Sequence, residues 1–115
     1  MGCLFCNIIN GTIPSKKIYE DDMVFAFEDI SPQSPVHILV VPKTHVQDIE
    51  ESVGKDISIL ADVFHGVTKV VEIKGLKEKG YRVIINNGKA AGQVIWHLHV
   101  HVMGGKDNLG PMLHK

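Results

Sequence analysis

The segment Trp96-His-Leu-His-Val-His-Val-Met-Gly-Gly105 (WHLHVHVMGG) contains three of the seven histidines in the chain, at every second position. Successive side chains of a β-strand point to opposite faces, so one face would carry the imidazoles of His97, His99 and His101. The other face would carry the aliphatic side chains of Leu98, Val100 and Val102. We therefore predict a strand over residues 97–103, buried on its aliphatic side and ended by the two glycines.

Three interpretations of the imidazole face are open at this point. It can be the polar face of a half-buried strand that is simply rich in histidine. It can be a metal site, because His-x-His on a strand offers two nitrogens to one zinc ion. It can also be a site of nucleophilic or acid–base chemistry, because imidazole titrates near neutral pH and can attack phosphorus.

The composition is that of one soluble globular domain, which we expect to span residues 1–115. Hydrophobic residues make up 44% of the chain and charged residues 22%, and the formal net charge is −1. Such a chain has no basic field for a nucleic acid polymer, so small ligands are the expected partners. No apolar run has the length of a membrane span or a signal peptide, and we expect a cytoplasmic protein without membrane contact.

The remaining pattern predicts an α+β fold with an antiparallel meander sheet and one long helix. Turn residues separate short β-type segments, and a long helical pattern ends at Gly75. The expected strands cover residues 23–29, 37–42, 81–86 and 97–103, and the expected helices cover residues 3–11 and 56–74.

The long helix carries two neighbouring apolar stripes, and together they cover about half of its circumference. The first stripe consists of Ile57, Leu60, Phe64, Val67 and Val71. The second consists of Ile59, Val63, Val70 and Ile73. One sheet does not easily cover so wide an arc, so we expect the second stripe to pack on the same helix of a second copy, across a two-fold axis. The alternative is one wide core stripe.

With these elements in place, the chain closely resembles the histidine triad (HIT) family, and within it the Hint-type nucleotide-binding hydrolases of bacteria. The family pattern His-φ-His-φ-His-φ-φ, where φ is apolar, stands here as HLHVHVM over residues 97–103. Three further segments are similar to the family and extend the resemblance over nearly the whole chain. They are IPSKKIYEDDMVFAFEDISPQSPVHILVVPKTH (13–45), GYRVIINNGKAAGQ (80–93) and LGPMLHK (109–115).

The resemblance implies a single HIT domain that forms a two-fold homodimer with one continuous sheet. It also implies hydrolysis of purine nucleoside phosphoramidates and aminoacyl adenylates, conjugates of AMP or GMP type, through a nucleotidyl intermediate on His99. His101 would contact the phosphate oxygens, and His97 would orient His99 through its backbone carbonyl. His37 matches a family histidine beside the triad. The alternative is a module that binds nucleotides or a partner with little turnover.

The resemblance also implies a nucleotide pocket in which the carboxylate of Asp29 binds both ribose hydroxyls. The base would lie against Leu4, Phe5, Ile8, Ile13, Phe27 and Ile30. The phosphate loop would include Asn86, Gly92, Gln93 and Val94. Many family members carry a hydroxyl residue after the Gly-Gln pair. Val94 cannot donate a hydrogen bond, so turnover or leaving-group preference is expected to differ here.

Both cysteines belong to one Cys-x-x-Cys motif, Cys3 and Cys6. Two cysteines supply half of a tetrahedral zinc site. Some bacterial members that resemble this chain complete a structural zinc site at the positions of His45 and His97. The alternative is that the two cysteines are small buried hydrophobic residues. No organic cofactor is expected.

Overall fold

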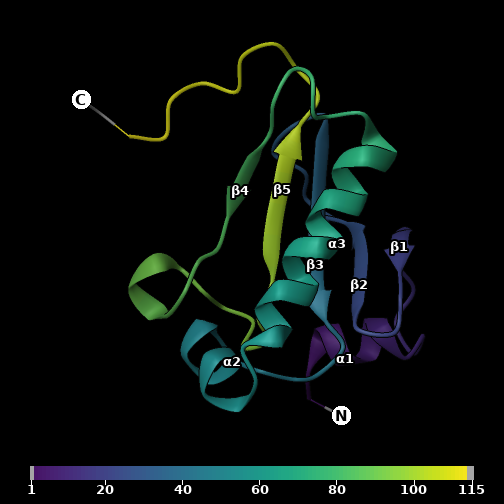
Figure 1. Ribbon diagram of the computed structural model, residues 1–115, viewed down its shortest axis with the longest axis vertical. Coiled ribbons are helices and arrows are strands. Elements are labelled where there is room, and N and C mark those ends of the chain that lie inside the picture. The colour runs from purple at the N-terminus through teal and green to yellow at the C-terminus, as the bar shows by residue number, and fades with distance from the viewer. Residues whose placement is uncertain (1, 114–115) are drawn as a thin grey trace.

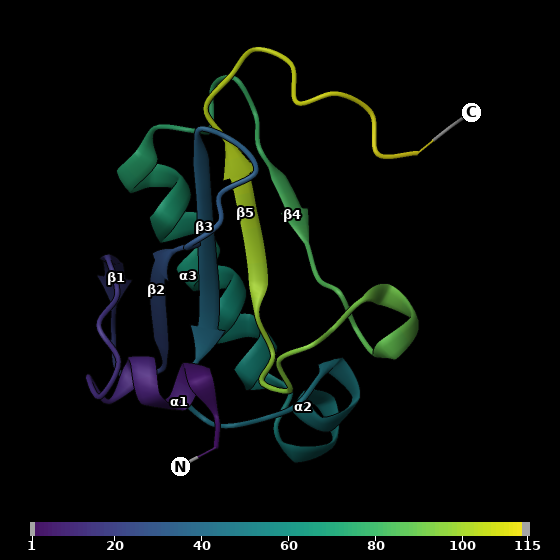
Figure 2. The same ribbon diagram turned by 180° about the vertical axis from the view of Figure 1, so that it is seen from behind.

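The computed structural model describes residues 2–113. Five antiparallel strands form one sheet in the order β1-β2-β3-β5-β4, and helices lie on both of its faces (Figures 1 and 2). The strands are β1 (Lys17–Glu20), β2 (Val24–Glu28), β3 (Val36–Pro42), β4 (Arg82–Ile84) and β5 (Val100–Gly104). The helices are α1 (Leu4–Ile9), α2 (Ile49–Lys55), α3 (Ser58–Lys74) and the short 3-10 turn at Lys89–Ala91. This arrangement confirms the predicted α+β class.

The two faces of the sheet have separate hydrophobic cores because strand side chains alternate in direction. Helix α3 packs on the first face, whose buried residues include Val24, Ala26, Ile38, Val40, Val100 and Val102. Helix α1 packs on the second face, where Phe5 and Ile8 form a cluster with Phe25, Phe27, Leu39 and Val41. The alternation along β5 and the residues before it therefore sends the valines toward α3 and leaves His99 and His101 on the side of α1.

The predicted meander is correct for the neighbours β2 and β3 and wrong for the last two strands. Strand β5 lies between β3 and β4, so the chain skips one position in the sheet when it passes from β3 to β4. The connection between those strands contains α2 and α3, and a connection of that length does not require its strands to be neighbours. Strand β4 consequently forms the edge of the sheet.

The histidine strand begins later than predicted, at Val100 rather than at His97. The ladder between β3 and β5 ends at the pair Val40–Val100. Two residues further along β3 is Pro42, which has no N–H to donate, and its carbonyl oxygen lies 2.8 Å from Nε2 of His97. The alternation nevertheless continues through this segment, since Leu98 is buried like Val100.

Helix α3 confirms the predicted long helix and its end, where Gly75 adopts a left-handed conformation (φ 64°). Its buried face consists of Ile59, Val63, Gly66, Val67, Val70 and Val71. The assignment of Ile59, Val63 and Val70 to a dimer surface was therefore wrong, because these side chains fill the core of one chain. The exposed apolar residues of this region are Ile57 (65%), Phe64 (43%) and Ile73 (52%).

Two elements were not predicted, strand β1 and helix α2. Strand β1 is four residues long and begins and ends on charged residues, so it has almost no apolar pattern. Helix α2 begins at the cap Asp48, whose side chain accepts a hydrogen bond from the backbone N–H of Glu51. Within residues 2–113, none of the helices combines the length and the apolar character needed to cross a membrane.

Candidate functional site

The imidazole of His99 is held in one tautomer by the backbone. Its Nδ1 lies 2.9 Å from the carbonyl oxygen of His97. A carbonyl only accepts, so Nδ1 carries the proton and Nε2 has a free lone pair. Burial lowers the pKa of His99, although the hydrogen bond to His97 and the charge of Asp29 act in the opposite direction. At neutral pH this ring is therefore neutral, with an unprotonated nitrogen available as a nucleophile.

The neighbouring ring, His101, is fixed in the opposite tautomer by His37. The backbone N–H of Gln33 donates to Nδ1 of His37 at 3.0 Å, so a neutral His37 carries its proton on Nε2. That Nε2 lies 2.9 Å from Nδ1 of His101, which must accept. Burial, followed by the charges of His99 and His37, lowers the pKa of His101 to about 4. A neutral His101 thus carries a proton on Nε2.

His99 and His101 both line one pocket of about 810 Å³ on the α1 face of the sheet. Their ring centroids are 5.3 Å apart. The lining also contains most of the positions expected to bind a nucleotide, namely Leu4, Phe5, Ile8, Ile13, Phe27, Asp29, Ile30, Asn86, Gly92 and Val94. The fold therefore places a lone pair, a hydrogen-bond donor and an apolar wall around one cavity.

Asp29 follows strand β2 directly and lies at the pocket beside His37. Its Oδ1 accepts a hydrogen bond from the backbone N–H of Ser31 at 2.8 Å, and its Oδ2 lies 3.4 Å from Nε2 of His37. The side chain is 17% exposed, so it is reachable from the cavity. Each carboxylate oxygen accepts more than one hydrogen bond, so the carboxylate retains acceptor capacity for hydroxyl groups of a ligand.

Three expected site residues stand outside the pocket lining. His37 lies behind His101, and His97 is fully buried behind His99. The side chain of Gln93 accepts from Gly88 N–H of its own loop at 2.8 Å and donates to the carbonyl oxygen of Gln47, before α2, at 2.7 Å. We therefore assign Gln93 to the support of the loop that carries Gly92 and Val94.

The pocket also contains residues that the sequence did not indicate. These are Pro14, Ser15, Lys16, Glu28, Pro32, Leu39 and Ile95. Lys16 is the cation of this set, and the hydrogen bond from Glu28 N–H to its carbonyl oxygen holds it beside the end of β2. The residues before β1 have no hydrophobic periodicity from which the sequence could place Lys16. The backbone hydrogen bond with Glu28 brings Lys16 to the pocket.

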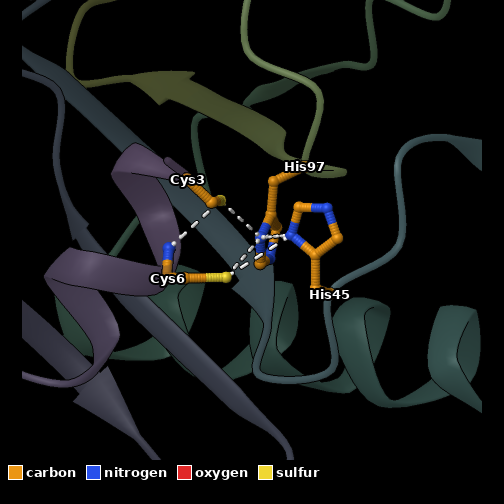
Figure 3. Close-up of side chains that lie close together, drawn as sticks. All are labelled: Cys3, Cys6, His45 and His97. Carbon is orange, nitrogen blue, oxygen red and sulfur yellow. Dashed lines mark hydrogen bonds between the residues drawn. The ribbon is translucent and has the colours of Figure 1, made fainter. Parts of the chain in front are cut away.

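A second cluster lies next to the pocket and consists of Cys3, Cys6, His45 and His97 (Figure 3). Their ligand atoms all lie within 4.8 Å of one another. Nδ1 of His97 is 3.3 Å from Sγ of Cys3, 3.6 Å from Sγ of Cys6 and 3.2 Å from Nδ1 of His45. Two sulfurs and two imidazole nitrogens are a donor set that suits a tetrahedral metal ion.

The protonation of His97 fits this use. Its Nε2 lies 2.8 Å from the carbonyl oxygen of Pro42, so Nε2 carries the proton and Nδ1 presents its lone pair to the cysteines. Burial lowers the pKa of His97 to about 4, which keeps the ring neutral. The residues can therefore hold a metal ion. His101 belongs to a different group, with Asp29 and His37, so among the described residues the triad is not one metal-binding set.

Comparison with known proteins matches residues 10–108 to the family model of the HIT domain. The chain belongs to the HIT family. It is 41% identical to a purine nucleoside phosphoramidase of Escherichia coli (strain K12), over 96% of this chain and 92% of that protein.

Solved structures of HIT proteins have the same fold. A histidine triad protein from Clostridium difficile matches with a TM-score of 0.90 and 43% identity, over 96% of each chain. A HIT family hydrolase from Clostridium thermocellum matches with a TM-score of 0.91 and 45% identity, over 98% of this chain and 97% of that one. The chain thus has the fold of HIT proteins along almost its full length.

Proposed function

We propose that this HIT protein hydrolyses purine nucleoside phosphoramidates and aminoacyl adenylates through a nucleotidyl intermediate on His99. The observation that carries the proposal is the pair of opposed tautomers in the pocket, a bare Nε2 on His99 beside a protonated Nε2 on His101. The relative named purine nucleoside phosphoramidase, 41% identical over 96% of this chain, supports the substrate class.

In the proposed first step, Nε2 of His99 attacks the α-phosphorus of the nucleotide. In a phosphoramidate the bond between phosphorus and nitrogen breaks, and the amine departs after taking one proton from solvent. In an aminoacyl adenylate the bond between phosphorus and the acyl oxygen breaks, and the carboxylate departs without a proton. The Nε2–H of His101 donates to a phosphate oxygen and stabilises the negative charge of the transition state. The carbonyl oxygen of His97 accepts from Nδ1–H of the ring, which becomes positively charged when the phosphorus–nitrogen bond forms.

In the proposed second step, water attacks the phosphorus and the bond to His99 breaks. The ring returns to its neutral form and one proton goes to solvent, so the two steps balance. Asp29 binds the ribose hydroxyls, and the apolar wall that includes Phe5, Ile8 and Phe27 holds the base. The loop before Val94 can approach the phosphate closely, since Gly92 lines the pocket, has no side chain and adopts a left-handed conformation (φ 86°).

The metal cluster is proposed to bind zinc in a structural role. Cys3, Cys6, His45 and His97 would hold the ion, and its chemistry there is to cross-link the chain. None of the catalytic steps above requires it.

We also propose that two copies form a two-fold dimer whose sheets join at β4. Strand β4 is the edge of the sheet, and its residue Val83 and the preceding Tyr81 are 37% and 39% exposed. An exposed strand edge is a template for pairing with another chain. The exposed apolar residues Ile57 and Phe64, seven positions apart and so on one side of α3, would supply the helix contact.

A second candidate is a nucleotide-binding module with little turnover, and Val94 favours it. This side chain is 82% exposed at the pocket and cannot donate to a phosphate or leaving group. A steady-state assay with adenosine and guanosine 5′-phosphoramidates and an aminoacyl adenylate separates the two candidates. Release of amine and nucleoside monophosphate over many turnovers supports the hydrolase, whereas saturable binding without product supports the module.

A further inference from the structure

We propose that metal binding at Cys3, Cys6, His45 and His97 positions the nucleotide pocket, by tying α1 to the segment that carries His99. The inference rests on the proposed function for its ligand and goes beyond a purely structural zinc ion. It predicts that the pocket wall and the orientation of the nucleophile both depend on metal occupancy.

His97 connects the cluster to the nucleophile through three of its own polar atoms. Nδ1 lies among the ligand atoms of the cluster, within 3.2–3.6 Å of its other members. Nε2–H donates to the carbonyl oxygen of Pro42, at the end of β3. The backbone carbonyl oxygen accepts from Nδ1–H of His99. A shift of His97 therefore moves the group that fixes the tautomer of His99.

Helix α1 connects the same cluster to the pocket wall. Cys3 and Cys6 flank Leu4 and Phe5, and both of these residues line the pocket. The ring centroid of Phe5 lies 5.0 Å from that of His99 and 5.9 Å from that of His97, in edge-to-face contact with each. A six-residue helix is not stable on its own, so α1 depends on its tertiary contacts.

Those contacts hold α1 unevenly along its length. Phe5 and Ile8 are buried against the second face of the sheet. At the N-terminal end, Cys3 packs beside the same hydrophobic cluster, and the polar side-chain contacts of Cys3 and Cys6 are those of the metal cluster and the cap between them. Without a metal, these four groups are joined by the contacts of Cys3 with His97 (3.3 Å) and of Cys6 with His45 (3.4 Å), and sulfur forms only weak hydrogen bonds. Loss of the metal therefore loosens the N-terminal end of α1, where Leu4 and Phe5 line the pocket, although Phe5 keeps its core contacts.

His45 provides a test that leaves the pocket itself untouched. It is exposed, it follows β3, and it contacts Cys6 and His97 but is absent from the pocket lining. His45→Gln removes one ligand nitrogen without changing α1 or any pocket residue. His65→Gln is the matched control, because His65 is an exposed histidine on α3 outside both sites.

The experiment compares zinc-loaded wild type, chelator-treated wild type, His45→Gln and His65→Gln by zinc content, amide hydrogen exchange and calorimetric titration with AMP. The amides of Asn7 and Asn10 report on α1 directly, since they bond the carbonyl oxygens of Cys3 and Cys6. If α1 stays packed against the sheet in only about one tenth of the metal-free molecules, the apparent affinity for AMP falls about tenfold. In the chelator-treated protein and in His45→Gln we expect AMP affinity to fall by at least this factor and the α1 amides to exchange faster. His65→Gln should behave like the wild type in both measurements.

The inference is overturned if the wild type binds no zinc. It is also overturned if α1 exchange and AMP affinity stay within about twofold when zinc is removed. Failure of AMP to bind the zinc-loaded wild type would contradict the proposed function instead, and α1 exchange with and without zinc would then decide the coupling by itself.

Discussion

The carbonyl oxygen of His97 lies 2.9 Å from Nδ1 of His99, and Nδ1 of the same His97 lies 3.3 Å from Sγ of Cys3. One residue thus orients the nucleophile with its backbone and belongs to the metal cluster with its ring. A second relay, from Gln33 through His37, orients His101. The site consists of two imidazoles whose tautomers are set by backbone groups, and this gives the predictions below.

His37 should act as a positioning residue for His101, through the hydrogen bond of 2.9 Å between their rings. His37→Leu removes the donor and should lower kcat about a hundredfold, because His101 can then turn its protonated nitrogen away from the phosphate. His37→Gln offers an amide N–H at a similar place and should recover most of that loss. Steady-state kinetics on a purine phosphoramidate measure both, and equal losses in the two variants would argue against the relay.

Gly66 should be required for the packing of α3 on the sheet. A Cβ at this position would lie 2.9 Å from Cγ2 of Val24 and 3.1 Å from Cγ1 of Val40. Gly66→Ala is therefore expected to lower the free energy of unfolding by about 1 to 2 kcal/mol despite the higher helix propensity of alanine. Gly54→Ala in α2 meets nothing within 4 Å and should raise it by up to about 1 kcal/mol. Urea unfolding of the two variants tests whether their changes in the free energy of unfolding have opposite signs.

The proposed dimer predicts different effects for substitutions at two adjacent residues of α3. Phe64 is 43% exposed, so Phe64→Glu should leave the fold intact and shift sedimentation from dimer to monomer by placing charges at the interface. Val63 is fully buried, so Val63→Glu should instead unfold the chain. Circular dichroism distinguishes these outcomes. A wild type that sediments as a monomer at micromolar concentration would rule out the proposed assembly.

Stability should fall when the pH drops from about 6.5 toward 4. Burial lowers the pKa of His101 from 6.5 to about 4, so between these values the unfolded chain binds a proton there and the folded chain does not. The free energy of unfolding therefore decreases with decreasing pH in this window. His101→Gln should make the decrease shallower, and His65→Gln should retain it. Urea unfolding at several pH values between 4 and 7.5 tests the slope; an unchanged slope in His101→Gln would contradict the assignment.

Much of the fold was predictable because its strands and its long helix have clear periodicity. The alternation around His99 and the stop at Gly75 both appear in the structure. The position of β5 inside the sheet was not predictable from order along the chain, because sequence neighbours need not pair across a long connection. Helix α2 did have a local signal, the spacing of Asp48 and Glu51, but its apolar stripe is too short to stand out.

The assignment of helix faces shows where pattern alone fails. A wide apolar arc on α3 indicates that more than one surface is covered, but it does not say which stripe faces the sheet. Gly66 decides this, because a residue without a side chain permits close approach to Val24 and Val40, and it brings Val63 and Val70 into the core. The tautomers of His97 and His101 were equally beyond the sequence, since they depend on groups distant in the chain, the carbonyl of Pro42 and the ring of His37. The orientation of His99 by the carbonyl of His97 was expected from the family resemblance.

The central claim is that His99 attacks phosphorus while His101 only stabilises the transition state. Rapid acid-free quenching with a radiolabelled purine phosphoramidate, followed by mass spectrometry of the peptide over residues 97–103, measures it most directly. We predict a nucleotidyl group on His99 in the wild type, none in His99→Ala with a rate loss of at least about four orders of magnitude, and a slower but present adduct in His101→Ala. An adduct that forms in His99→Ala at near the wild-type rate would contradict the account.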